Sequence, residues 1–201
     1  MADIWFHTAE SNADLIKGIL PDPAGVAHVV RPDLLARAVT LNGLDEKLRT
    51  DVRAAFENEL SSSRLICTCS SLGPVADDLA GQGHDVLRLD RVLAGLAADC
   101  GGRVSVLYAA PSTRDTTEDI FQAAFRATDR TGDISVSCVD GAWDLFLSGR
   151  IDLYLERIAD RARNELKEAR LVVLAQLSMS RVVDLFPDEK RGRSWALLMR
   201  L

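Results

Sequence analysis

The chain has 201 residues, of which 47% are apolar and 27% are charged. This is the composition of a folded globular protein rather than a disordered or fibrous one. The length suits one large domain or two small ones, with a core that needs neither disulfides nor a structural metal. A formal net charge of −6 argues against a nucleic-acid surface, because neutralising phosphates requires clustered lysine and arginine.

No run of 18 apolar residues predicts a membrane-spanning helix, and the N-terminal sequence has no apolar export signal. We therefore expect a cytoplasmic protein whose four cysteines are reduced. Cys67 and Cys69 are separated by one residue rather than two, and no second pair completes a zinc site. His7, His28 and His84 show no metal-ligand spacing. We expect no metal.

Six short apolar segments along the chain are typical of buried β-strands. They cover residues 3–7, 64–69, 85–89, 103–108, 134–138 and 171–175. Continuous apolar runs of this length suit strands that are buried on both faces, as in a parallel sheet.

Amphipathic helical patterns separate these segments. Apolar residues recur at helical spacing in residues 48–60, 120–125 and 151–166, which indicates one apolar stripe on each helix. Pro32 suits the first position of a further helix. Strands that alternate with such helices predict βαβ units and a doubly wound α/β fold.

The two halves of the chain resemble each other. A shift of 107 residues places Ile66–Leu72 on Val173–Met179. Both segments have the pattern of an apolar strand, a small polar turn and a helix. We therefore predict two pseudo-symmetric, doubly wound parallel-sheet halves with a cleft between them.

The predicted halves cover residues 1–100 and 101–187, and residues 188–201 form a tail. Trp195, Leu197 and their apolar neighbours make this tail too apolar to stay in water, because exposed apolar patches usually mark contacts. We expect the tail to pack back on the chain or to form a homodimer contact.

Polar residues follow four of the predicted strands. They lie at His7–Thr8, Cys69–Ser71, Pro111–Thr113 and Gln176–Ser178. Ligands of doubly wound sheets bind outside the carboxyl ends of strands, so these ends would converge on the cleft if the halves face each other. Hydroxyl groups and helix N-terminal amides would suit a carboxylate there. Cys69 is the strong nucleophile of this set, and a helix that begins at the Ser70–Ser71 turn would favour its thiolate.

Each of these residues also has a purely structural interpretation. A cysteine near a strand end can be inert packing. Ser70, Ser71 and Ser178 are good helix N-caps, and Ser112–Thr113 can cap the helix that follows them. Gln176 can satisfy backbone groups at its strand end.

Five segments together resemble the aspartate/glutamate racemase superfamily. In chain order they are Thr68–Gly73 (TCSSLG), Leu89–Asp90, Ala110–Thr113 (APST), Gly141–Ala142 and Val173–Met179 (VLAQLSM). Their order and spacing, over about residues 3–186, are most similar to the branch that carries CSSLG and LAQxSM motifs.

The resemblance implies two α/β domains with an active site between them and chemistry, without a cofactor, at the carbon next to a carboxylate. Racemases of this family use two cysteines, one on each face of that carbon, and Cys69 matches the first. Hydroxyl groups would hold the substrate carboxylate and its developing enolate. The predicted substrate-binding residues are Thr8, Ser70, Ser71, Ser112, Thr113 and Ser178.

One position departs from the family pattern. The 107-residue shift puts Gln176 at the second cysteine, and an amide cannot act as a base at pH 7. We therefore predict an isomerase- or racemase-like enzyme that acts on a small carboxylate or amino acid through one cysteine thiolate, with decarboxylation as a related one-base reaction. The alternative is a catalytically impaired carboxylate-binding protein of the same fold. Generic nucleotide binding is disfavoured because no GxGxxG follows the first strand.

Overall fold

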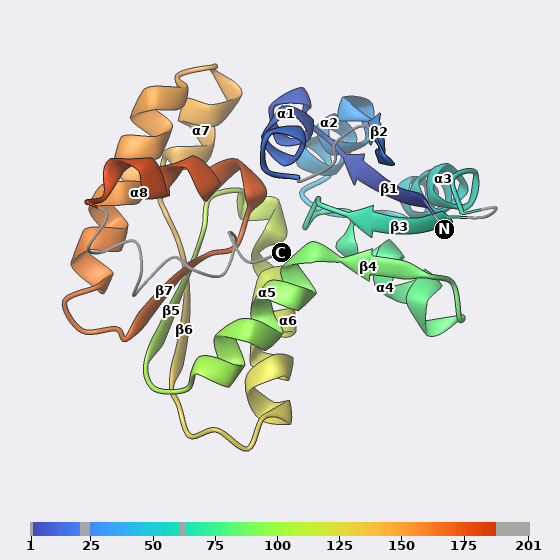
Figure 1. The fold of residues 1–201 in the computed structure, drawn as a ribbon. Helices are drawn as coiled ribbons and strands as arrows, with labels where there is room; N and C mark the ends of the chain where they lie inside the picture. The colour runs from blue at the N-terminus through green and yellow to red at the C-terminus, as the bar shows by residue number, and fades with distance from the viewer. Residues whose placement is uncertain (1, 21–24, 61–62, 188–201) are drawn as a thin grey trace. The chain divides into compact units, whose positions relative to one another are not determined.

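The computed structural model describes residues 2–20, 25–60 and 63–187. The chain forms two compact units, Met1–Leu89 (unit 1) and Asp90–Leu201 (unit 2). Each unit has one sheet whose strands are all parallel, with helices between the strands (Figure 1). The predicted α/β class with parallel sheets is confirmed. Within the described residues, no helix combines the length and the apolar character needed to cross a membrane.

Unit 1 contains a four-stranded sheet in the order β2-β1-β3-β4. The strands are β1 (Ala2–His7), β2 (Ala27–Val30), β3 (Ser63–Cys67) and β4 (Val86–Arg88). The helices are α1 (Glu10–Ile19), α2 (Pro32–Thr40), α3 (Glu46–Glu57) and α4 (Gly73–Gly81). The chain runs from β1 outward to β2 and then back across to β3. Because parallel crossovers are right-handed, this reversal puts α1 on one face of the sheet and the other three helices on the opposite face.

The core of unit 1 lies on the face that α2, α3 and α4 cover. Phe6 and Leu65 of the sheet share one buried cluster with Leu34 of α2 and with Val52 and Phe56 of α3. The rings of Phe6 and Phe56 meet edge to face with their centroids 4.7 Å apart, which is a preferred geometry for aromatic pairs. Alternation along β1 and β3 therefore sets which side chains enter this core.

Unit 2 contains a three-stranded sheet in the order β6-β5-β7. The strands are β5 (Val104–Tyr108), β6 (Ile134–Cys138) and β7 (Leu171–Leu174). The helices are α5 (Leu89–Cys100), the 3-10 turn η2 (Pro111–Thr113), α6 (Arg114–Ala127), α7 (Ala142–Leu147), α8 (Ile151–Glu165) and the 3-10 segment η3 (Leu177–Leu185).

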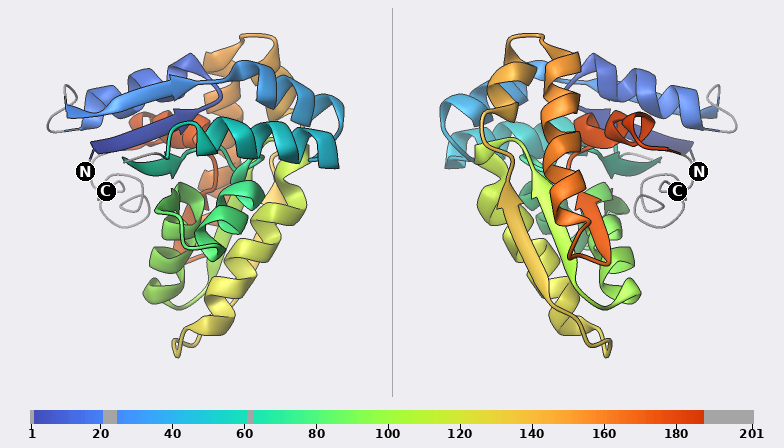
Figure 2. Two further views of the ribbon diagram at one scale, coloured as in Figure 1. Left: turned by 90° about the vertical axis from the view of Figure 1, so that its right-hand side faces the viewer. Right: turned by 90° about the vertical axis from the view of Figure 1, so that its left-hand side faces the viewer.

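Helices cover both faces of the unit 2 sheet. Val104 and Val106 share a buried cluster with Leu93 of α5 and Phe121 of α6. On the opposite face the Ser105 hydroxyl donates to α8. Figure 2 shows α8 on one side of the strands and α6 on the other. Because α5 packs in this cluster, it belongs with unit 2, and the unit boundary lies at its beginning rather than at its end.

The hydrogen-bond registers of the two sheets match. The amide of Thr68 donates to the carbonyl oxygen of Phe6 at 3.1 Å, and the amide of Ala175 donates to that of Leu107 at 2.9 Å. In both units this bond joins the residue after the third strand to the first, central strand. Residues of these two segments that are 107 positions apart therefore occupy equivalent positions in the two sheets.

Two differences from the sequence analysis concern elements. Strand β2 was not predicted, because His28 interrupts the apolar residues of Ala27–Val30 and none of the four is buried. The tail at 188–201, with its predicted packing or dimer contact, lies outside the described residues. The other six strands lie within one or two residues of the predicted segments.

A buried arginine joins β4 to the start of α4. The side chain of Arg88 is 5% exposed, and its Nη1 donates to Asp77 Oδ2 at 2.6 Å. The guanidinium lies against the backbone of Gly73, where an added Cβ would overlap Nε and Cζ and come within 2.8 Å of Nη2. Glycine is therefore required at the first residue of α4 by close approach.

We expect Gly73→Ala to lower the free energy of unfolding by about 1–3 kcal/mol, the usual cost of overpacking. The new Cβ would push the Arg88 guanidinium away from Asp77. Gly81→Ala is the matched control, because a Cβ at that end of α4 has no neighbour within 4 Å and alanine favours a helix by up to about 1 kcal/mol. Urea unfolding followed by circular dichroism measures both variants. Equal stability of the two would contradict the close-approach requirement.

Candidate functional site

Each sheet has a topological switch point, where the chain reverses its direction of crossing. It lies between β1 and β3 in unit 1 and between β5 and β7 in unit 2. Ligands of open parallel sheets bind outside the carboxyl ends of the strands at such points. The predicted site residues Thr8, Cys69, Ser70 and Ser71 follow β1 and β3, and Ser112, Thr113, Gln176 and Ser178 follow β5 and β7. Each unit therefore brings its own predicted residues to one switch point.

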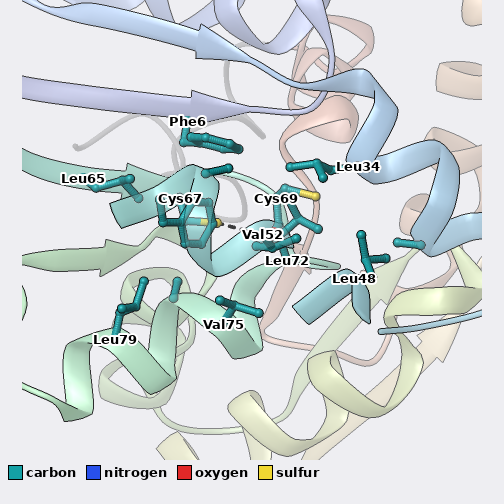
Figure 3. Close-up of a cluster of buried hydrophobic side chains, with 14 residues drawn as sticks. Phe6, Leu34, Leu48, Val52, Leu65, Cys67, Cys69, Leu72, Val75 and Leu79 are labelled. Atoms are coloured by element: carbon teal, nitrogen blue, oxygen red, sulfur yellow. Dashed lines mark hydrogen bonds between the residues drawn. The ribbon is translucent and has the colours of Figure 1, made fainter. Parts of the chain in front are cut away.

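Cys69 lies two residues beyond β3, between the strand-end loop and the core of unit 1. It is 8% exposed and belongs to the buried cluster that also contains Leu34 and Leu72. Figure 3 shows Cys69 at the end of the cluster near these two residues, with Cys67 nearer to Phe6. The thiol of Cys67 donates to the carbonyl oxygen of Cys69 at 3.5 Å. The Cys69 backbone thus belongs to the loop, while its side chain contacts apolar groups.

Ser70 and Ser71 were expected to be N-caps of the following helix, but the structure differs. Helix α4 begins only at Gly73, its N-cap is Leu72, and no side chain caps it. The predicted capping role of the two serines is wrong. The reason is that backbone carbonyls close the turn instead, since the amide of Leu72 donates to Cys69 and that of Gly73 to Ser70, both at 3.2 Å. Both serines are buried, and their hydroxyls are not used to cap α4.

Thr8 follows β1 directly and is 3% exposed. Helix α1 begins at Glu10 with Ala9 as its N-cap, and no side chain caps this helix either. The hydroxyl of Thr8 therefore has no capping role. It lies at the same switch point as the Cys69 loop, because β1 and β3 are neighbours in the sheet.

A chain of three hydrogen bonds runs along the switch point of unit 1. The hydroxyl of Thr68 donates to the carbonyl oxygen of Phe6 at 3.0 Å. It therefore accepts from Nδ1 of His7 at 2.9 Å, and Nε2 of His7 accepts from Nδ1 of His28 at 2.9 Å. Hydrogen-bond pairing of this kind assigns the tautomer of each ring. The two imidazole rings also stack, with centroids 5.2 Å apart.

This chain of bonds requires neutral histidines. The pKa of His7 is lowered from 6.5 to about 4, mainly by burial and further by the neighbouring His28 and Lys17. Burial and Lys17 also lower the pKa of His28. His7 is fully buried. The sequence analysis missed the roles of His28 and Thr68, because the first lies on the unpredicted β2 and the contacts cross between strands.

Gln176 at the switch point of unit 2 binds backbone groups. Its Oε1 accepts from the amide of Ala109 at 2.7 Å and from the amide of Ala110 at 3.0 Å. Both amides leave β5 at its carboxyl end and lack ladder partners, so they need an acceptor. The two donors also fix the orientation of the side-chain amide, because only its oxygen can accept. Gln176 thus satisfies backbone groups, the structural interpretation considered for it, and its remaining polar group is the donor Nε2.

The hydroxyl groups predicted to bind substrate in unit 2 differ in whether they already form hydrogen bonds. Thr113 is buried and donates to the carbonyl oxygen of Ala110 at 2.8 Å. Ser178 Oγ lies 2.9 Å from the hydroxyl of Tyr154, whose pKa is raised by burial. Ser112 Oγ is buried and has no hydrogen-bond partner among the described residues. The hydroxyl of Ser112 can therefore still donate a hydrogen bond to a ligand, whereas that of Thr113 already donates to Ala110.

The structure places one further thiol against the backbone of Ala109. Cys138, the last residue of β6, donates to the carbonyl oxygen of Ala109 at 3.7 Å. Burial and the neighbouring Asp140 raise the pKa of Cys138, and Arg114 opposes this shift. The thiol is therefore protonated at neutral pH. No spacing in the sequence pointed to this residue as part of the site.

The two switch points offer different chemistry. Unit 1 has a thiol with three buried hydroxyl-bearing residues at Thr8, Ser70 and Ser71. Unit 2 has an amide, a protonated thiol and the hydroxyl of Ser112. In residues 2–20, 25–60 and 63–187, no three histidine, cysteine or acidic side chains gather closely enough to hold a metal ion.

The neutral state of His7 predicts a pH-dependent stability. The unfolded chain takes up a proton at His7 below about pH 6.5, whereas the folded chain resists it down to about pH 4. The free energy of unfolding should therefore fall by about 3 kcal/mol from this group as the pH drops through that interval. Urea unfolding at several pH values measures the slope.

His7→Asn should remove most of this slope, because its amide can donate to Thr68 but does not titrate. His84→Gln is the control, since His84 is exposed and takes no part in the chain of bonds. A slope in His7→Asn as steep as in the unmodified protein would show that another group causes it.

Comparisons with known proteins bear on the fold. No protein-family model matches the chain, and no curated protein matches it by sequence. The structure is similar to that of an aspartate racemase from Picrophilus torridus, with a TM-score of 0.64 and 10% sequence identity. The match covers 97% of this chain and 88% of the racemase. The chain therefore has the α/β fold of an aspartate racemase, with two parallel sheets.

Proposed function

We propose that this chain is a cofactor-independent isomerase- or racemase-like enzyme that acts at the α-carbon of a small carboxylate through a thiolate at Cys69. The observation that carries the proposal is the place of Cys69 at the switch point of unit 1, in a chain that has the fold of an aspartate racemase. The fold alone does not fix an activity, so the chemistry is argued from the residues.

The proposed roles in unit 1 follow from which groups can donate. The Cys69 thiolate would take a proton from the α-carbon and return it, with an enolate in between, or it would add to the carbon–carbon double bond of an unsaturated carboxylate, whose π electrons move to that carboxylate until the thiolate leaves. The hydroxyls of Thr8, Ser70 and Ser71 would hold the carboxylate and the negative charge that develops on it. That none of the three caps a helix supports this role.

The proposed roles in unit 2 also depend on which side chains can still donate a hydrogen bond. Ser112 keeps its donor and is the best candidate for a substrate contact. Thr113 and Ser178 already form hydrogen bonds and would contact substrate mainly as acceptors. Gln176 cannot replace a cysteine as a base. These features support a reaction with one base, on one face of the carbon, rather than a two-thiol racemisation.

A second function is favoured by the packing of Cys69. Its side chain contributes to a buried apolar cluster, and buried cysteines are often inert. The alternative is therefore a carboxylate-binding protein that lacks turnover. The partner in either case would be a small carboxylate or an amino acid. Homodimer formation through the tail stays a prediction, as does a cytoplasmic location.

Replacement of the thiol separates the two functions. We expect Cys69→Ala to abolish deuterium exchange from solvent at the α-carbon of the substrate while binding persists, because the hydroxyl donors remain. Cys69→Ser should be nearly as damaging, since a serine hydroxyl is far less acidic. Proton NMR in D₂O, with aspartate, glutamate and malonate as probes, measures exchange.

Cys100→Ser is the control, because Cys100 is exposed at the end of α5 and does not follow the carboxyl end of a strand. Full exchange by Cys69→Ala would rule out the proposed thiol chemistry. Binding of a probe without exchange by the unmodified protein would favour the alternative.

Removal of one hydroxyl tests the carboxylate contact. We expect Ser71→Ala to lower the rate by the loss of one donor to the developing negative charge, which typically costs about 2.7–4 kcal/mol. Ser148→Ala is the matched control, because this exposed serine only bonds its own helix end on α7. Steady-state rates of both variants provide the comparison. A Ser71→Ala rate within about twofold of the control, well below the effect of a lost donor, would remove Ser71 from the site.

A further inference from the structure

Equivalent backbone amides after the first strand of each unit differ in their hydrogen-bond acceptors. The carbonyl of His7, at the end of β1, accepts from the residue after β2 at 2.9 Å, and the carbonyl of Tyr108, at the end of β5, accepts from the residue after β6 at 2.8 Å. The two residues that follow are therefore equivalent, Thr8–Ala9 in unit 1 and Ala109–Ala110 in unit 2. Each pair presents two consecutive amides at a switch point.

In unit 2 these amides converge on a single oxygen, that of Gln176. In unit 1 the equivalent side chain is Cys69, and no backbone carbonyl of the described residues accepts from the amides of Thr8 and Ala9. A pair of backbone donors aimed at one acceptor is the arrangement that binds an oxyanion or a carboxylate oxygen. Gln176 Oε1 thus occupies the place of a ligand atom.

The surroundings of Ala109–Ala110 suit an anion. Ser112, in the turn that follows, has a buried hydroxyl with no partner among the described residues. Arg114 lies close enough to Tyr108 to act on its pKa, although it also pairs with Glu118 at 3.4 Å. Two negative groups also act near these residues, Glu118 on Tyr108 and Asp140 on Cys138.

We propose that the amides of Ala109 and Ala110 form a carboxylate-binding site of unit 2 and that the side chain of Gln176 is its built-in occupant. An amide oxygen and a carboxylate oxygen accept in the same geometry, but the carboxylate bonds are charge-assisted and stronger. A tethered side chain competes at a high effective concentration, so Gln176 keeps the site closed to dilute carboxylates. The inference concerns unit 2 alone and does not rest on the chemistry proposed for Cys69.

Gln176→Ala opens the site. We expect malonate to shift the backbone amide NMR signals of Ala109 and Ala110 in this variant, in a saturable titration. In the unmodified protein the same shifts should require a malonate concentration about tenfold higher or more, because the side chain competes. Gln122→Ala is the matched control, since Gln122 lies exposed on α6 of the same unit and should titrate like the unmodified protein.

Two outcomes would overturn the inference. One is the absence of any shift at Ala109 and Ala110 when malonate is added to folded Gln176→Ala. The other is an equal response of Gln176→Ala and Gln122→Ala. Because the readout is at named amides of unit 2, it is separate from a failure of exchange at Cys69, which would leave these shifts unchanged.

Gln176→Glu tests the same site even if the alanine variant does not fold. The substitution puts a carboxylate where the amide oxygen lies, at nearly the same size. We expect hydrogen exchange of the Ala109 and Ala110 amides at pH 7 to be as slow as in the unmodified protein or slower, and malonate to cause no shift. Faster exchange would show that these amides reject a carboxylate and would overturn the inference.

Discussion

The backbone amides just after the end of a strand at a switch point have no carbonyl partner in the sheet, so they need another hydrogen-bond acceptor. This constraint applies at both switch points of the chain, where the first strand of each unit ends. Unit 2 meets it with the oxygen of Gln176, which takes both amides of Ala109–Ala110. Unit 1 has Cys69 at that place, and no backbone carbonyl of the described residues accepts from the amides of Thr8 and Ala9. The switch point of unit 2 thus satisfies its own amides through a side chain, whereas in unit 1 the proposed function assigns this role to a ligand carboxylate.

Buried polar groups hold the loop of unit 1 in place at its switch point. The bonds from Phe6 through Thr68 and His7 to His28 join three neighbouring strands just before the loop. Beyond it, Arg88 packs on the backbone of Gly73 at the start of α4. Buried polar groups stabilise only when their partners are present, so each bond restricts the positions that the strands can take. The Cys69 loop is therefore fixed at both ends, which is the pre-organisation that the proposed function needs.

Much of the fold could be predicted from the sequence, because apolar runs and helical periodicity are local signals. Strand β2 was missed because it is not a continuous apolar run: His28 interrupts it, and none of its four residues is buried. The equivalence of Cys69 and Gln176 could also be predicted, since the shift is visible in the residues themselves. The bonds of Gln176 could not, because an acceptor is identified by distances between strands rather than by spacing along the chain. The capping role expected for Ser70 failed for a related reason, since backbone carbonyls close that turn.

The asymmetry between the units limits the chemistry that the fold can support. A two-base reaction needs a group on each side of the carbon that can both gain and lose a proton. Gln176 does neither, and its oxygen is held by two backbone donors, so even its orientation is fixed. Cys138 stands nearby, but its raised pKa keeps it a thiol, and it already donates to Ala109. Unit 2 is therefore suited to donate hydrogen bonds to a carboxylate, and the proposed function assigns the proton transfer or addition to the thiol of Cys69.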